Sequence, residues 1–184
     1  MPFKILDIKF YIVTVFTVTM FFSCKDNFKE VQNIGIVDSG PLTVAEHINT
    51  KYTDSGRLKM NLQSAKMLDF SNRAFAFFEF PIGVNLDIFD ADNNKSNVIA
   101  DYALVYTKTD LIDLRGNVVL TTHNKDTLFA EQLYYDQKTQ WLFTNQPVRF
   151  VRQNEIINGN GFDSNRNFTN AEVLETTGII YIDE

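Results

Sequence analysis

From about Val44 onward, apolar and polar residues alternate in short segments, and the segments end in clusters of Asp, Asn, Ser, Gly and Lys. Alternation at period two is the pattern of a half-buried β-strand, and the polar clusters are typical of turns. The spacing of the clusters suits hairpins, so the pattern favours mostly antiparallel strands. The turns are predicted at residues 53–56, 90–94, 107–110, 124–126, 136–139, 153–155 and 164–167.

The segments between the turns are rich in Phe, Tyr, Val, Ile and Leu, which are strand-forming residues. Helix is expected only locally, near Ala45–Asn49 and Ala171–Leu174, because no longer stretch keeps apolar residues at helical spacing. We therefore expect an all-β domain. Its strands are predicted at Arg73–Phe80, Gly83–Phe89, Val98–Tyr106, Leu111–Thr121, Thr127–Tyr135, Trp141–Thr144, Val148–Arg152 and Gly178–Ile182.

The N-terminal segment has a different pattern. Lys4 and Lys9 precede an apolar run over Phe10–Phe22, and Ser23 precedes Cys24, the only cysteine. This order indicates a secretory signal, because a membrane-spanning helix needs about 18 or more apolar residues. Its last residues resemble a bacterial lipoprotein signal, in which the cysteine thiol is acylated and the peptide before it is removed; an uncleaved anchor helix is the alternative. The predicted parts are a signal peptide (1–23), lipidated Cys24 with its tether (24–43), and one β domain (44–184).

Composition narrows the possible partners. The formal net charge is −6, whereas nucleic-acid binding requires a basic patch or stripe, so we expect no nucleic-acid partner. The acidic balance also argues against electrostatic docking to anionic lipid headgroups. With Cys24 acylated, no disulfide can form, and the domain must rely on its hydrophobic core.

Several segments, taken in order, resemble the periplasmic lipopolysaccharide-export proteins, most closely their inner-membrane-anchored C component, the LptC family. The resemblance implies a twisted, half-open β-jellyroll with a hydrophobic interior behind an N-terminal membrane anchor. It also implies a periplasmic protein at the inner membrane, which in this family is often anchored by an uncleaved helix. This chain departs from that pattern, because Cys24 predicts a lipid anchor. The resemblance rests on Tyr52–Gly56, Phe80–Val84, Phe89–Asp92, Ala100–Ala103, Leu114–Leu120, Leu128–Asp136, Phe143–Val148 and Gly159–Phe162.

Proteins of this family accept lipopolysaccharide from an inner-membrane ABC transporter and pass it along a bridge of similar jellyrolls to the outer membrane. An open jellyroll ends in strands with unpaired backbone groups, which a partner's edge strand can complete. We therefore expect the transporter components and a periplasmic jellyroll bridge protein as partners, joined by edge-strand pairing. Gly178–Ile182 is either such an edge or an interior strand of the same domain.

Apolar residues at period two define a candidate lipid-binding interior, since alternate residues of a strand share a face. In a closed sandwich the same side chains would simply form the core, so a purely structural spacer is an alternative. A slip of one residue would reverse the selection on any strand. The candidates are Leu114, Val118, Leu120, Leu133, Trp141, Phe143, Val148 and Phe150.

Catalytic and cofactor motifs give little support for an enzyme. The sequence has no phosphate-binding loop, no G-x-S-x-G elbow and no H-E-x-x-H. His47 and His123 lie far apart, and Asp90 with Asp92 reads as a hairpin turn because Lys95 stands where a calcium loop has glycine. We expect no enzyme activity, cofactor or metal; a two-carboxylate glycosidase stays open, because its residues need only be about 5–10 Å apart in space.

The sequence thus predicts a membrane-anchored periplasmic lipid-transfer protein that takes its energy from a partner, because it has no nucleotide motif. The main alternative is a surface or periplasmic lipoprotein that binds a glycan or a protein partner through an exposed aromatic patch. Trp141, Tyr134 and Tyr135 would supply that patch. The two hypotheses differ in where the aromatic side chains point.

Overall fold

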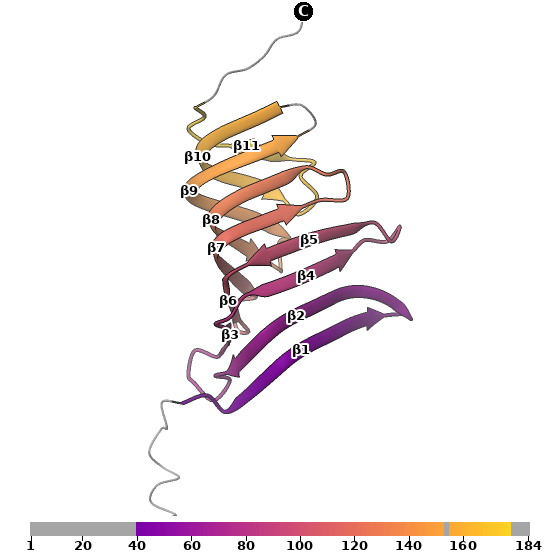
Figure 1. The fold of residues 1–184 in the computed structure, drawn as a ribbon, viewed down its shortest axis with the longest axis vertical. Coiled ribbons are helices and arrows are strands. Elements are labelled where there is room, and N and C mark those ends of the chain that lie inside the picture. The colour runs from indigo at the N-terminus through magenta and orange to yellow at the C-terminus, as the bar shows by residue number, and fades with distance from the viewer. Residues whose placement is uncertain (1–39, 153–154, 178–184) are drawn as a thin grey trace, which may run out of the picture. The chain divides into compact units, whose positions relative to one another are not determined.

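The computed structural model describes residues 40–152 and 155–177. The signal peptide, Cys24, most of the tether and the predicted strand Gly178–Ile182 lie outside the described residues. The described regular elements are all strands of one continuous antiparallel sheet (Figure 1), which confirms the all-β class. The strands are β1 (Thr43–Asp54), β2 (Arg57–Asp69), β3 (Phe77–Phe80), β4 (Val84–Phe89), β5 (Lys95–Ala100), β6 (Tyr102–Tyr106), β7 (Leu111–Thr121), β8 (Thr127–Asp136), β9 (Trp141–Arg152), β10 (Glu155–Asn165) and β11 (Ala171–Val173).

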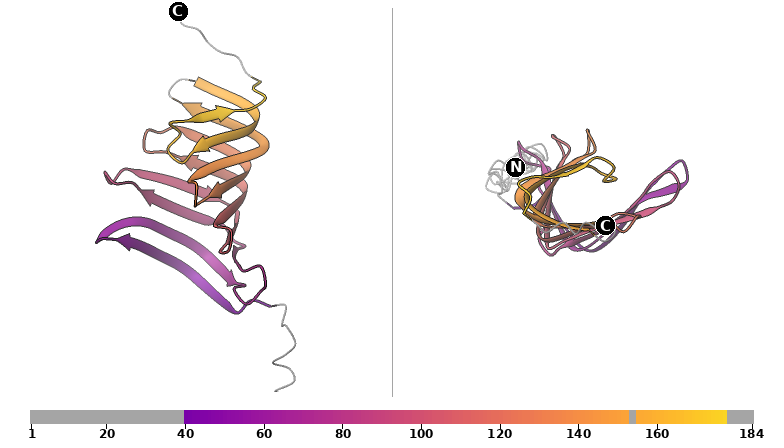
Figure 2. Two further views of the ribbon diagram at one scale, coloured as in Figure 1. Left: turned by 180° about the vertical axis from the view of Figure 1, so that it is seen from behind. Right: turned by 90° about the horizontal axis from the view of Figure 1, so that it is seen from above.

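The sheet folds over on itself because its long strands change neighbours along their length. β7 pairs with β6 through Leu111–Arg115 and with β5 through Val119–Thr121. β2 likewise pairs with β4 and then with β3. A strand that serves two neighbours in this way belongs to two layers, and the view from above shows the resulting open curve (Figure 2). The architecture is that of a half-open β-jellyroll.

We call the layer that contains β4 and β5 the first layer, and the layer that contains β3, β6 and β11 the second layer. β2 and β7–β10 contribute one half to each layer. Irregularities in pairing occur where these strands cross the bend, for example between Arg115 and Val118 of β7. Bulges bend a strand and increase its twist, so they allow the sheet to close.

Glycine is required at this bend. Gly116 has φ +72°, a conformation that favours glycine, and a Cβ at this position would lie 3.1 Å from side-chain atoms of Asp101. Asp101 sits between β5 and β6, where its backbone N–H donates to the Gly116 carbonyl oxygen (2.9 Å). Asn117 Nδ2 donates to the Asp101 carboxylate (2.6 Å). The bend is therefore held by its own hydrogen bonds.

Two predictions about the strands were wrong at this bend. The segment Val98–Tyr106 was expected to be one strand but forms β5 and β6, which separate at Asp101 because the chain passes there from one layer to the other. Conversely, Trp141–Thr144 and Val148–Arg152 were expected to be separate and form the single strand β9. The polar segment between them stays in the sheet because β10 pairs along it, with Asn160 opposite Pro147.

The two local helices predicted from the sequence are wrong. Ala45–Asn49 lies in β1, which pairs with β2 along its length, and Ala171–Val173 forms β11. β1 is exposed over most of its residues, so it lacks the strong alternation that marks a half-buried strand. Its conformation is set by pairing with β2. The predicted strand at Arg73–Phe80 is shorter than expected, since β3 begins at Phe77.

Candidate functional site

The facing surfaces of the two layers are apolar and enclose the lumen, our name for the space between these inner faces. In the first layer, each strand contributes one apolar residue that pairs with an apolar residue of the neighbouring strand, so that these residues form a row across the sheet. We call this set the first-layer row. Its members are Leu62, Leu86, Val98, Leu120, Leu128, Phe150 and Ile157.

The second layer faces this row with another apolar surface. Ala103, Leu114 and Leu133 stand opposite one another across β6, β7 and β8. All three are buried, and Leu133 is fully so. The lumen is thus lined by side chains that come from nearly every strand, which is an arrangement no single sequence segment reveals.

Six of the eight predicted interior residues line the lumen. They are buried and belong to one hydrophobic cluster. In β7, Leu114 and Val118 keep the same parity and share the inner face, although Gly116 and Asn117 interrupt the alternation. In β8 the inner positions change parity, from Leu128 and Ala130 to Leu133. The six are Leu114, Val118, Leu120, Leu133, Val148 and Phe150.

The other two predicted residues, Trp141 and Phe143, lie on the outer face of the second layer. Phe143 is 38 % exposed and stacks on Tyr134, with ring centroids 5.2 Å apart. The Trp141 indole N–H donates to the Asp163 carboxylate. The neighbouring Leu142, 3 % exposed, faces the lumen instead. The expected inward orientation was wrong because β9 is one strand, whose inner positions keep one parity from Leu142 to Phe150.

A small cavity lies at the centre of the lumen. Its floor is apolar, and its open space amounts to about 70 Å³, room for only a few water molecules at about 30 Å³ each. This space is too small for an acyl chain, so the layers must move apart or side chains must shift to admit one. The floor is lined by Leu86, Ile88, Val98, Ile112, Leu114, Leu120 and Leu142.

The rim of this cavity is polar. Asp90 and His123 come from hairpin tips of the first layer, and Tyr135 and Arg166 come from the second. Hydrogen bonds from Asn94 lower the pKa of Asp90, and nearby His123 contributes in the same direction. Burial raises the pKa of Tyr135, which Arg166 partly opposes. An apolar floor under a rim of opposite charges suits an amphiphile, with its tails inside and its head at the rim.

Burial changes along the lumen. At the end near β2 and β4, the inner side chains of Leu62 and Leu86 are only half-buried. Towards β9 and β10, Leu128, Phe150 and Phe162 are 3 % exposed or less. In the view from above, the β1–β2 hairpin extends away from the curve formed by the later strands (Figure 2). The lumen is therefore open at its β2 end and filled at its β10 end.

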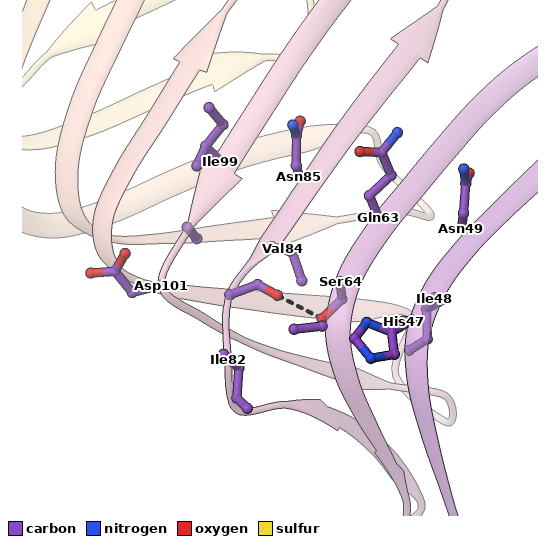
Figure 3. Close-up of a pocket in the computed structure, with 13 residues that line it drawn as sticks. His47, Ile48, Asn49, Gln63, Ser64, Ile82, Val84, Asn85, Ile99 and Asp101 are labelled. Atoms are coloured by element: carbon purple, nitrogen blue, oxygen red, sulfur yellow. Dashed lines mark hydrogen bonds between the residues drawn. The ribbon is translucent and has the colours of Figure 1, made fainter.

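A second, shallower hollow lies on the outside of the bend. It is lined by Asn49, Gln63 and Asn85, with Ile82 and Ile99 beside them (Figure 3). The Ser64 hydroxyl donates to the Gly83 carbonyl oxygen (2.7 Å) and holds β2 against the start of β4. This hollow, of about 600 Å³, is widely open to solvent, and its walls are about equally polar and apolar. It lacks the continuous apolar lining of the lumen.

Sequence reasoning missed a buried acid on the outer face of the second layer. Asp113 is 1 % exposed, and its carboxylate accepts from Arg115 (2.9 and 2.5 Å) and from Gln132 Nε2 (2.7 Å). Because each partner is a charged or amide donor, the acid is satisfied without a ligand. Its only sequence signal was a carboxylate between apolar residues in a strand.

The residues of the predicted glycan patch are divided between the faces. Tyr134 and Trp141 face outward, while Tyr135 lines the lumen rim. The described part of the chain contains no group of three or more His, Cys, Asp or Glu residues placed to hold a metal ion. It also contains no helix long and apolar enough to cross a membrane.

An open β-jellyroll with an apolar lumen and a polar rim is an architecture suited to hold an amphiphile. The family comparison agrees: residues 10–181 match the family described as "Lipopolysaccharide-assembly, LptC-related", so the chain belongs to the LptC family. Membership implies a role in lipopolysaccharide transport at the periplasmic side of the inner membrane. A search of curated proteins found no match.

Proposed function

We propose that this protein accepts lipopolysaccharide from an inner-membrane ABC transporter and passes it, with its acyl chains in the lumen, to a periplasmic jellyroll bridge. The first-layer row carries the proposal, because it forms an uninterrupted apolar track across the domain. The sugar head stays in water beside the polar rim. No bond of the lipid is changed during this passage.

The lumen suits a lipid that must move on. Burial of acyl chains contributes about 0.8 kcal/mol per CH₂ and has no preferred direction, so a chain can slide from one side chain to the next at little cost. Directional hydrogen bonds inside the track would instead trap the lipid. Energy for net movement comes from the transporter, and later molecules push earlier ones forward.

Edge strands support the proposed partners. Among the described residues, β1 pairs only with β2, and β11 pairs only with β10. Each can add a strand of a neighbouring jellyroll through main-chain hydrogen bonds, which would join the lumens end to end. With the N-terminus held at the membrane through Cys24, we place β1 at the transporter side and β11 at the bridge side.

A charge placed in the open end of the lumen tests this proposal. Leu62→Asp puts a carboxylate on the first-layer row, and Gln63→Asp puts the same group on the adjacent outer position. Both residues lie on β2, so the effects on strand propensity are matched. We expect Leu62→Asp to lower binding of purified lipopolysaccharide by more than about tenfold, since an unpaired charge against acyl chains costs several kcal/mol.

Gln63→Asp should bind as the unsubstituted protein does. Equal binding by the two folded variants would place the lipid outside the lumen. In that case the outer aromatic surface around Tyr134 and Trp141 becomes the site to test, with a free oligosaccharide as the ligand.

A further inference from the structure

The β10 end of the lumen is closed by a side chain that belongs to no strand. Phe168 lies in the loop between β10 and β11, yet its side chain is 0 % exposed. Its ring meets those of Phe150 and Phe162 edge to face, with centroids 5.4 Å away in both cases. Phe150 and Phe162 are themselves 5.5 Å apart. The three rings together fill the lumen between β9 and β10.

Phe168 adopts this position against its own backbone preference. Its φ is +58°, in the left-handed region that bulky side chains rarely occupy. Its backbone N–H donates to the Asn165 carbonyl oxygen (3.0 Å), which is a local turn contact. The conformation must therefore be held by contacts from outside the loop.

Those contacts come from the opposite layer. Arg152 Nη2 donates to the Phe168 carbonyl oxygen (2.5 Å), and Arg152 Nε donates to the Asp126 carboxylate (3.1 Å). Arg152 ends β9, and Asp126 lies in the β7–β8 hairpin of the first layer. We call Asp126, Arg152 and the Phe168 carbonyl the latch. The latch fastens the loop of the second layer to the tips of the first.

We infer that Phe168 is the gate of the lumen and that lipid leaves the domain only when its ring swings out. This inference rests on the proposed function and names the residue that controls the β10 end. A ring on a loop can leave without breaking any strand pairing, unlike Phe150 or Phe162. An acyl chain offers these two rings the same apolar contact that Phe168 gives them, so the exchange keeps the surface buried.

The surroundings give the loop room to move. Beside the latch lies a solvent-open hollow of about 630 Å³, lined by Asn124, Asn167 and Thr169 as well as the latch residues. Release of Phe168 also relieves its left-handed backbone. Both features favour a gate that opens when an acyl chain takes its place, and closes again when the chain has passed.

Photo-crosslinking beyond the gate tests the inference. Ile157 lies on the first-layer row opposite Phe150, at the last described position of that row. A photoreactive residue at Ile157 is placed in the otherwise unsubstituted full-length protein and, separately, in the Phe168→Ala variant, in cells that make lipopolysaccharide. We expect the lipid adduct at Ile157 to rise about tenfold with Phe168→Ala, the factor that corresponds to a gate worth about 1.4 kcal/mol.

Arg152→Gln opens the gate by a second route, because it removes the latch but keeps the ring. It should raise the Ile157 adduct in the same direction, and it guards against a Phe168→Ala protein that folds poorly. Phe143→Ala removes an aromatic side chain from the outer face of β9, the strand that Arg152 ends, and should leave the Ile157 adduct unchanged. A parallel probe at Leu114, in the middle of the lumen, reports lipid before the gate.

The outcomes separate the two proposals. An adduct at Leu114 together with an unchanged Ile157 adduct in folded Phe168→Ala and Arg152→Gln would overturn the gate and leave lipid transport standing. No adduct at either position in any variant would overturn lipid transport itself. A rise at Ile157 in both variants, with none in Phe143→Ala, supports the gate.

Discussion

Substitution of two neighbouring residues on β9 measures which face of the strand is the inner one. Leu142→Ala removes the larger part of a side chain that is 3 % exposed, and Phe143→Ala removes a ring that is 38 % exposed. For Leu142, the lost burial is about 2.4 kcal/mol at about 0.8 kcal/mol per CH₂, and the residual cavity raises the cost to about 3–4 kcal/mol. For Phe143, the lost stack on Tyr134 and partial burial cost about 1–1.5 kcal/mol.

Urea unfolding followed by the fluorescence of Trp141, the only tryptophan, provides the assay. With a slope of about 2 kcal/mol per M urea, Leu142→Ala should lower the unfolding midpoint by about 1.5–2 M and Phe143→Ala by about 0.5–0.75 M. The smaller side chain is thus expected to cause the larger loss, which is the reverse of their ranking by size. A larger loss for Phe143→Ala, at equal slopes, would refute the inner register of β9.

Two further predictions concern a glycine in β10, compared with one in the β1–β2 turn, and a tyrosine on β6. Gly159→Ala should destabilise the protein by more than about 2 kcal/mol, because its Cβ would lie 2.3 Å from the Leu174 carbonyl oxygen. Gly56→Ala brings its Cβ within 4 Å of no atom, so it should cost only about 1–2 kcal/mol, for its positive φ. The unfolding midpoints of the two variants compare these costs. Burial and the hydrogen bond to Glu79 raise the pKa of Tyr102 to about 12. The stability that Tyr102 contributes should be complete below about pH 10 and be lost as the pH rises towards about 12, and Glu79→Gln should lower the midpoint of its ultraviolet titration. An unchanged midpoint in Glu79→Gln would count against that hydrogen bond.

Local patterns predicted several of the strands that have one buried and one exposed face, although β2 and β10 were not among the predicted strands. β7 runs over Leu111–Thr121 as expected, because its apolar residues alternate on both sides of Gly116. The turns predicted within the described residues also matched their polar clusters, as at Asp90, whose carboxylate accepts from the backbone N–H groups of Asp92 and Asn94. Such short-range hydrogen bonds leave a signature in the sequence, so they can be recognised without knowledge of the fold.

Features that depend on pairing between distant strands could not be predicted. β1 reads as a weak pattern because it is an exposed edge, and only its pairing with β2 makes it a strand. β9 reads as two strands because Asn145–Pro147 resembles a break, although β10 pairs across it. A misplaced break allows the two halves of a strand to be assigned different inner positions. This error in β9 led to the prediction that Trp141 and Phe143 face the lumen.

The burial of Phe168 could not be predicted from the sequence for the same reason. Phe168 follows a polar cluster that predicts a turn, and an aromatic residue in a turn is expected to be exposed. Its burial depends on Phe150 and Phe162 from two other elements and on Arg152 across the latch. None of these contacts is local in sequence except the turn itself. A composition rich in Phe could indicate a large core, but not which ring closes it.

Site-specific photo-crosslinking in living cells at Leu142 and at Phe143 tests the central claim most directly. The two positions are adjacent on β9 and face the lumen and the solvent, respectively. Lipid in the lumen predicts a lipopolysaccharide adduct at Leu142 and none at Phe143. An adduct at Phe143 without one at Leu142, in folded and membrane-bound protein, would contradict the account and place the ligand on the outer aromatic face.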